Sequence, residues 1–147
     1  MVAVRVMLDA IFYTTTALAT VSWLALICLP RTPRLLGVIR HGAVAVLCLV
    51  YVILAATQVG DLSGGFESLD ALHRLFSARA AVLIGWLHYL AFDLFIGVWI
   101  ALRCDHAGIK RIVQAPVLAF TFLAGPIGLL LFFGVAWRAK ITAEDHD

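Results

Sequence analysis

Three side chains that can exchange protons lie inside one strongly apolar segment, "GWLHYLAFDLFIGVWI", which runs from Gly85 to Ile100. They are His88, Tyr89 and Asp93, and Asp93 stands near the middle of the segment. A carboxylate at the centre of a bilayer costs at least about 2.5–3.5 kcal/mol on insertion scales. We therefore expect Asp93 to face the protein interior and either pair with a cation or keep its proton. A buried, protonated carboxylic acid can act as a proton donor.

The spacing places these side chains on one broad face of a helix. His88 and Asp93 are five residues apart, which is about 140° around an ideal helix, and Tyr89 lies between them in angle. Tyr89 is also four residues from Asp93, within reach of a hydrogen bond. The same sector holds Gly85, Phe92 and Ile96. The alternative is a polar cluster that only fixes helix packing, where hydrogen bonds contribute about 0.6 kcal/mol each on average.

A second stretch, "TFLAGPIGLLL", lies near the C-terminal end and combines Gly125, Pro126 and Gly128. Pro126 has no N–H, so it leaves the carbonyl of Phe122 without its helical partner. Thr121 is the nearby hydroxyl that we expect to compensate for this loss. The missing side chains could leave room for a ligand beside the backbone, or they could allow close packing of two helices.

The elements that must position these residues are transmembrane helices. The chain has 147 residues, 63% of them hydrophobic and 14% charged, whereas a soluble domain is about 45–50% apolar and about 25% charged. Four apolar segments cover residues 10–29, 42–59, 80–102 and 115–137. Each approaches the roughly 20 residues that cross a bilayer, and in lipid each must be helical. The first is expected to be a membrane span and not a signal peptide, because no cleavage site follows it.

The predicted fold is all-α: a polytopic membrane protein whose single domain, residues 1–147, is a four-transmembrane-helix bundle. Apolar residues between the second and third spans recur at helical spacing, at Phe66, Leu69, Leu72 and Phe76. This pattern predicts a short amphipathic helix in the membrane interface.

Charge gives a weak prediction of orientation. Four spans would put both termini on one side, with five basic residues there and six on the other side. The positive-inside rule then slightly favours termini that face away from the cytoplasm. Nothing resembles a dense basic stripe with interleaved aromatic residues, so we expect no nucleic-acid partner.

Metal and disulfide sites have little support. The three cysteines, Cys28, Cys48 and Cys104, form no CxxC pair, and their odd number argues against a disulfide framework. The five histidines form no HxxxH or ExxH motif, so no metal site and no cofactor are predicted. A haem held by His41 or His88 remains an alternative, because a single axial histidine leaves no spacing signature.

Several motifs together resemble one known family. They are "FESLDALHRLF", "GWLHYLAFDLFIGVWIA", "GI" at positions 108–109, and the run from Pro116 that contains "TF" and "GPIGLLLF". This combination is similar to the abscisic-acid-deficient-four-like family of small four-helix membrane proteins, and the resemblance covers about residues 66–132. The plant member of that family is associated with neoxanthin synthesis in chloroplasts.

The resemblance implies an activity related to carotenoids. Neoxanthin formation opens an epoxide and removes a proton, so it needs an acid and a base but no redox cofactor. Asp93, His88 and Tyr89 match the family motif and are the catalytic candidates that the resemblance implies. The implied ligand-binding residues are Trp86, Phe92, Ile96, Trp99, Thr121, Gly125, Pro126 and Gly128. The start at Met1 carries no Arg/Ser-rich transit segment, so we expect a bacterial member in the inner membrane.

Three functions remain in competition at this point. The first is an isomerase or a related membrane enzyme that rearranges a carotenoid- or retinal-like polyene inside the bundle. The second is a non-catalytic carotenoid- or lipid-binding protein that scaffolds others, and membrane lipid is an expected partner in either case. The third is a small transporter that uses Asp93, although the repeated halves of transporters are not visible here. The sequence leaves the oligomeric state open, including a homo-oligomer.

Overall fold

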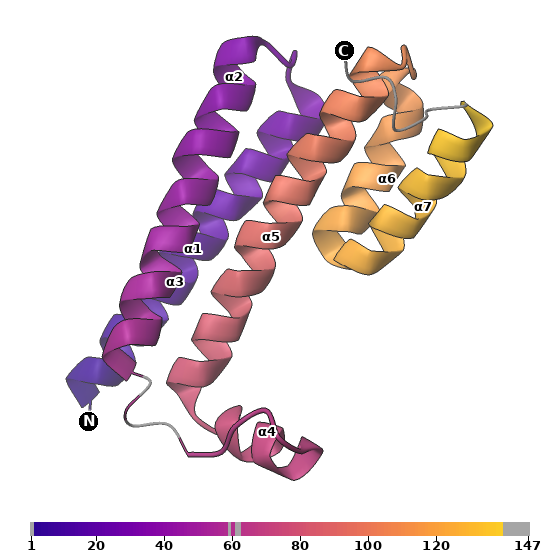
Figure 1. The fold of residues 1–147 in the computed structure, drawn as a ribbon. Coiled ribbons are helices and arrows are strands. Elements are labelled where there is room, and N and C mark those ends of the chain that lie inside the picture. The colour runs from indigo at the N-terminus through magenta and orange to yellow at the C-terminus, as the bar shows by residue number, and fades with distance from the viewer. Residues whose placement is uncertain (1, 59, 61–62, 140–147) are drawn as a thin grey trace.

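The computed structural model describes residues 2–58, 60 and 63–139, and within them every regular element is helical. In chain order, the elements are α1 (Val2–Cys28), α2 (Pro33–Gly37), the π-helical η1 (Val38–Ala43), α3 (Val44–Gln58), α4 (Leu69–Leu75), α5 (Arg79–His106), α6 (Arg111–Leu123) and α7 (Gly125–Arg138), as Figure 1 shows. The predicted all-α class is confirmed for these residues.

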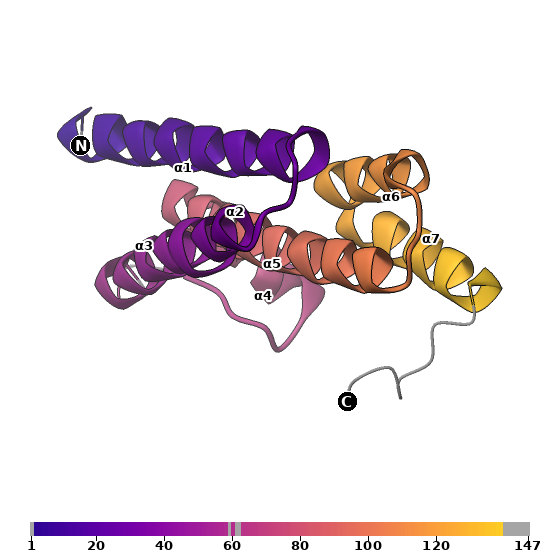
Figure 2. The same cartoon turned by 90° about the horizontal axis from the view of Figure 1, so that it is seen from above.

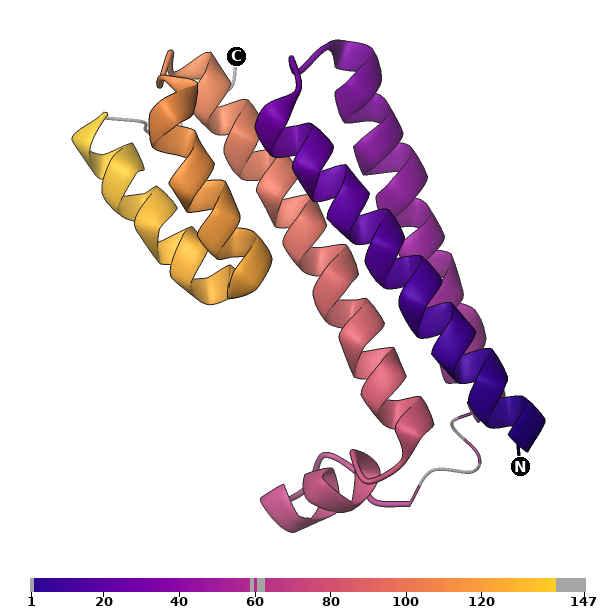
Figure 3. The ribbon, with the colours of Figure 1, turned by 180° about the vertical axis from the view of Figure 1, so that it is seen from behind.

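Three helices are long and apolar enough to cross a membrane: α1, the continuous helix formed by α2, η1 and α3, and α5. They run side by side, and α5 packs against α1, α3 and α6 (Figures 1 and 3). The core gathers around α5, where the indole of Trp23 lies directly over the backbone of Gly97. The outer faces expose many large apolar side chains, as expected where lipid covers them. The chain is therefore a membrane protein.

The prediction of a single span over residues 115–137, kinked at Gly125–Pro126, is wrong. The chain breaks at Ala124, which adopts φ −158° and ψ 81°, and α6 and α7 lie on either side of the break. Because Pro126 cannot donate to the carbonyl four residues back, it ends one helix and enters the first turn of the next, where its N–H is not needed. The two helices return along each other as a hairpin (Figures 1 and 2).

This hairpin is too short to span a bilayer. Its helices contain 13 and 14 residues, or about 20 Å of helix each, against a hydrocarbon core of about 30 Å. The expected four-helix bundle is therefore not confirmed: the described residues form three long helices and a hairpin of two shorter ones, which we predict to be re-entrant. The short helix α4 is present where it was predicted, and its location in the membrane interface stays a prediction.

The hairpin changes the expected topology. The start of α1 lies at one end of the molecule, and the end of α7 lies at the other, beside the end of α5 (Figures 1 and 3). We call this second end the basic end, because seven arginine or lysine residues fall there: Arg31, Arg34, Arg40, Arg103, Lys110, Arg111 and Arg138. The opposite end has three, Arg5, Arg74 and Arg79. Under the positive-inside rule, this distribution of the described basic residues predicts that the basic end faces the cytoplasm.

A buried polar cluster joins three helix ends at the basic end. The guanidinium of Arg31, whose side chain is 4% exposed, donates to both carboxylate oxygens of Asp105 at 2.9 and 3.0 Å. The buried side chain of Gln114 accepts from Arg31 and donates to Asp105 Oδ1 at 2.8 Å and to the Ile109 carbonyl at 2.7 Å. Arg111 also donates to carbonyls at the end of α1. The cluster holds the root of the hairpin against α1 and α5.

The topology predicts opposite locations for the two helix ends. Single cysteines at Arg5 and Arg138, in a variant without the three native cysteines, should react with a membrane-impermeant maleimide from opposite sides of sealed vesicles. Labelling of both positions from the same side would fit four complete spans and would contradict the re-entrant hairpin.

The cluster also makes a prediction about stability. Asp105→Ala removes the carboxylate partner of a buried guanidinium and should lower the free energy of unfolding by about 2–3 kcal/mol. Asp9→Ala is the matched control, because its pair with Arg79 is about half exposed and should contribute less than about 1 kcal/mol. Thermal unfolding in detergent measures both, and equal effects of the two substitutions would refute a special role for the cluster.

Candidate functional site

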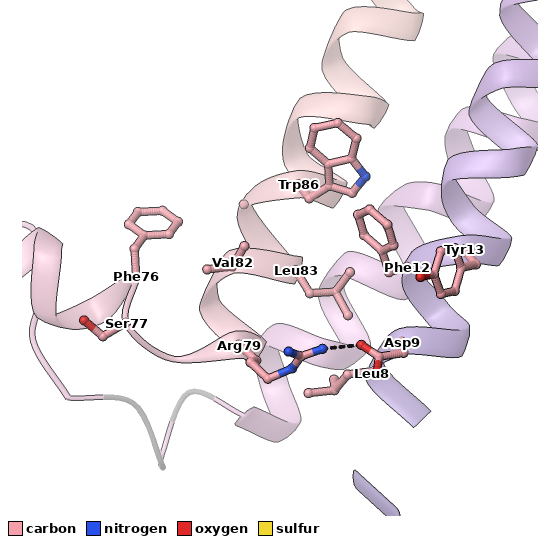
Figure 4. A pocket seen from close by; sticks show the side chains of 11 residues that line it. Leu8, Asp9, Phe12, Tyr13, Phe76, Ser77, Arg79, Val82, Leu83 and Trp86 are labelled. Atoms are coloured by element: carbon pink, nitrogen blue, oxygen red, sulfur yellow. Dashed lines mark hydrogen bonds and ion pairs between the residues drawn. The ribbon is translucent and has the colours of Figure 1, made fainter. Parts of the chain in front are cut away.

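A cavity of about 740 Å³ lies between α1, α4 and α5 (Figure 4). It lies beside the first turns of α5, the part of this helix that neither α6 nor α7 accompanies (Figure 1). Its lining is mostly apolar and aromatic and comprises Leu8, Asp9, Phe12, Tyr13, Phe76, Ser77, Arg79, Val82, Leu83, Gly85 and Trp86. Volumes of about 300–1,000 Å³ with such linings are typical of small-molecule sites.

The two ends of the cavity differ in polarity. Arg79, in the first turn of α5, forms an ion pair with Asp9 of α1 at the outer end (Figure 4). Trp86 lies two turns deeper, and its indole N–H already donates to Thr16 Oγ1 at 2.9 Å. Because this N–H is already used, a ligand at the inner end of the cavity can meet only apolar ring surfaces. These belong to Trp86 and to Phe12, whose ring centroids are 5.9 Å apart. The cavity suits a molecule with an apolar body.

The segment around α4 closes one wall of the cavity. Ser68 caps α4 by accepting from the Ala71 N–H at 3.1 Å, and the chain enters this cap through Gly64, whose φ is +99°. The ring of Phe76 then packs against Gly85 of α5, where a Cβ would lie 2.9 Å from the ring. A larger residue than glycine at position 85 would displace Phe76 and with it this wall.

Asp93 lies two turns beyond Trp86 on α5, at the tip of the hairpin. Its carboxylate packs against the backbone of Gly125 at the start of α7, and the Gly125 N–H and the Tyr89 hydroxyl face it. One carboxylate oxygen, Oδ2, is buried without a hydrogen-bond partner among the described residues. The positive end of the α7 helix dipole favours the ionised form of Asp93, whereas the burial of Oδ2 without a partner favours the protonated form that can donate a proton. The structure thus gives a physical reason for a carboxylate at the middle of an apolar helix.

Tyr89 connects this tip to the cavity. Its hydroxyl donates to the carbonyl oxygen of Phe122 at 2.6 Å, and its ring stacks on Trp86 with centroids 5.2 Å apart. The carbonyl that Pro126 leaves free is thus satisfied by Tyr89 from another helix. The prediction that Thr121 would do so is wrong, because its hydroxyl donates to the Val117 carbonyl at 2.8 Å.

His88 does not join Asp93 and Tyr89. Its imidazole is exposed and stacks on Phe92, with centroids 4.4 Å apart, while Tyr51 of α3 lies 6.0 Å away. The predicted catalytic set is therefore divided between two sides of α5. The catalytic role of these three residues stays a prediction.

The predicted ligand-binding residues are also dispersed, and only Trp86 lines the cavity. Phe92 lies with His88, and Ile96 is half-buried against the core. Trp99 meets Phe132 of α7 edge to face at 5.1 Å. The remaining four, Thr121, Gly125, Pro126 and Gly128, build the turn of the hairpin; the backbone and hydroxyl of Thr121 lie where a Cβ of residue 128 would be. Close packing explains these glycines.

Sequence reasoning missed the outer part of the cavity, namely Asp9, Phe12, Tyr13, Phe76 and Arg79. The charges at positions 9 and 79 were visible at the edges of two apolar segments, but 70 residues separate them. A single sequence gives no signal that they pair. Within the described residues, no group of three or more histidine, cysteine or acidic side chains could hold a metal ion.

The comparison with protein families supports the resemblance found in the sequence. The family model described as ABA DEFICIENT 4-like matches residues 10–132. The match covers most of the chain, so the protein belongs to this family. Neither a curated protein nor a solved structure matches the chain.

The contact between Asp93 and Gly125 predicts a rescue experiment. Gly125→Ala places a methyl group against the Asp93 carboxylate and should destabilise the protein by about 1–3 kcal/mol. Asp93→Ala in the same chain makes room for the methyl group, so the double variant should be more stable than the sum of the two single effects. Strict additivity in thermal unfolding would show that the two residues are not in contact.

Proposed function

We propose that this member of the ABA DEFICIENT 4-like family binds a carotenoid- or retinal-like polyene in the cavity between α1, α4 and α5 and rearranges it by acid–base chemistry. The cavity is the observation that carries the proposal: it is about 740 Å³ in volume and largely apolar. A polyene dissolves in lipid, so it can enter sideways without crossing water. The family's association with carotenoids supports the same class of ligand.

The shape of the site suits one end of a rigid, flat molecule. From Arg79 to Trp86 the helix rises about 10 Å, much less than the roughly 30 Å of the hydrocarbon core. A long polyene would place one end group against the exposed ring surfaces of Phe12 and Trp86, which line the cavity, and the rest would extend along α5 in the bilayer. Tyr89 and Asp93 do not line the cavity. They continue along α5 from Trp86, on which Tyr89 stacks, so the polyene must extend past Trp86 to meet them.

The proposed chemistry needs only proton transfer. Asp93, supported by Tyr89, would give a proton to a carbon of the conjugated chain, and the electron pair of one double bond would form the new C–H bond. The positive charge would spread over the remaining double bonds, which lowers the barrier to rotation. Return of a proton to the Asp93 carboxylate would restore the double bonds in a new geometry or position. The overall step is an isomerisation without net oxidation, and His88 has no part in it.

A non-catalytic binding protein is the second candidate, and one observation favours it. The Asp93 carboxylate already has a structural task, since it lies against the start of α7. A residue that stabilises the hairpin needs no further role in chemistry. The two candidates share the ligand and differ only in whether the ligand changes.

The binding proposal predicts a pigmented protein. Purified from the membranes of a host that makes carotenoids, the wild type should show polyene absorbance. Val82→Trp, which fills the cavity, should lose most of that absorbance per protein. Leu24→Trp is the control, because it adds the same side chain on an exposed face of α1 outside the cavity. A colourless wild type that carries only phospholipid would refute the proposal.

The catalytic part has a separate test. Asp93→Asn keeps the shape of the side chain but removes its acidity, so it should bind the polyene as well as the wild type and convert at least about 100-fold less of it, the usual contribution of general acid–base catalysis. Chromatography of the extracted pigment measures conversion. Equal conversion by both proteins would exclude Asp93 as the acid, and bound pigment that the wild type never changes would favour the binding protein.

A further inference from the structure

A second group of side chains lies at the basic end, on the far side of α5 from the cavity. The guanidinium of Arg103 lies over the indole of Trp99, 5.5 Å from the ring centroid. Arg40, in η1, lines a small cleft of about 60 Å³ together with Trp99. Three apolar residues of α5 complete the cleft: Phe95, Val98 and Leu102. One cation thus stacks on the indole of Trp99, and a second lines the apolar cleft that this indole helps to form.

Neither arginine has an acidic partner in the described part of the chain. The ion pairs found there are Arg31 with Asp105 and Arg79 with Asp9. A guanidinium has five N–H donors, and stacking on an indole leaves them available. Arg40 and Arg103 therefore offer positive charge and planar donors that no described carboxylate neutralises, which is the chemistry that recognises a phosphate group.

The depth of the group in the membrane matches that of a phospholipid. Arg103 lies in the last turn of α5 and Arg40 in η1, so both are near the basic end, where the chain leaves the bilayer. The apolar part of the cleft extends inward from them to Phe95, which is 42% exposed. A lipid beside α5 would have its headgroup at the arginines and an acyl chain on this surface.

We propose that Arg40, Arg103 and Trp99 form a binding site for one anionic phospholipid. The two guanidinium groups bind the phosphate, the indole holds Arg103 in place, and the cleft takes part of an acyl chain. The charge of the basic end favours this class of lipid, because the cytoplasmic leaflet carries the anionic lipids and attracts basic residues. The site does not depend on the polyene proposal, since it uses none of the residues that line the cavity.

Native mass spectrometry of the full chain in an equal mixture of phosphatidylglycerol and phosphatidylcholine tests the site. The wild type should retain phosphatidylglycerol preferentially. Arg40→Gln and Arg103→Gln should each lower its affinity about fivefold, the effect of one basic residue near a membrane surface. Arg34→Gln is the matched control: it removes one charge at the same end of the molecule, but Arg34 does not line the cleft.

Thermal unfolding in pure phosphatidylcholine separates a loss of lipid binding from a loss of protein stability. All variants should unfold at the same temperature there, and added phosphatidylglycerol should raise the unfolding temperature of the wild type and of Arg34→Gln only. An equal loss in Arg34→Gln would mean that lipids respond to the overall charge and would overturn the site. A wild type that binds phosphatidylglycerol and phosphatidylcholine equally well would also overturn the site.

Discussion

The structure depends on a reversal of the chain between α6 and α7, and the backbone at this reversal must have its polar groups satisfied. Pro126 frees the carbonyl of Phe122, and Tyr89 satisfies it with a hydrogen bond of 2.6 Å. Asp93 faces the Gly125 N–H at the start of α7. Irregular backbone at membrane depth is tolerated only where protein groups or water replace the lost helical bonds. Two polar residues of α5 therefore allow the reversal, and the lack of a side chain at Gly125 lets the carboxylate come close.

The reversal also explains where a ligand can bind. A helix that crossed the whole bilayer would cover α5 along its length, whereas the hairpin covers only the half near the basic end (Figure 1). The other half is bordered by α1 and by the segment around α4, and the cavity lies there. Tyr89 contacts both regions, since it bonds to the hairpin and stacks on Trp86. A ligand in the cavity would contact Trp86, which stacks on the residue that supports the turn.

The sequence predicted what depends on composition and local spacing. The three long helices, the short helix α4 and the special environment of Asp93 follow from hydrophobic length, helical periodicity and the cost of a charge in lipid. The direction of the chain after Leu123 could not be predicted from the sequence, because one apolar run of 23 residues fits either one span or two half-length helices. Pro126 marked the break but not its angle. The partner of the Phe122 carbonyl lies 33 residues away, and Asp9 and Arg79 are 70 residues apart, so no local pattern could reveal either contact.

A distance across the hairpin tests the reversal most directly. Spin labels at Ile112 and Trp137, which are exposed in the first turn of α6 and the last turn of α7, would be about 37 Å apart in one continuous helix. Packed antiparallel helices lie about 8–10 Å apart, so the labels in a hairpin should be about 20 Å or less from each other. Pulsed electron paramagnetic resonance in lipid nanodiscs, with the native cysteines replaced, should give a single short distance. A main population near 37 Å would contradict the hairpin and the arrangement of the cavity that follows from it.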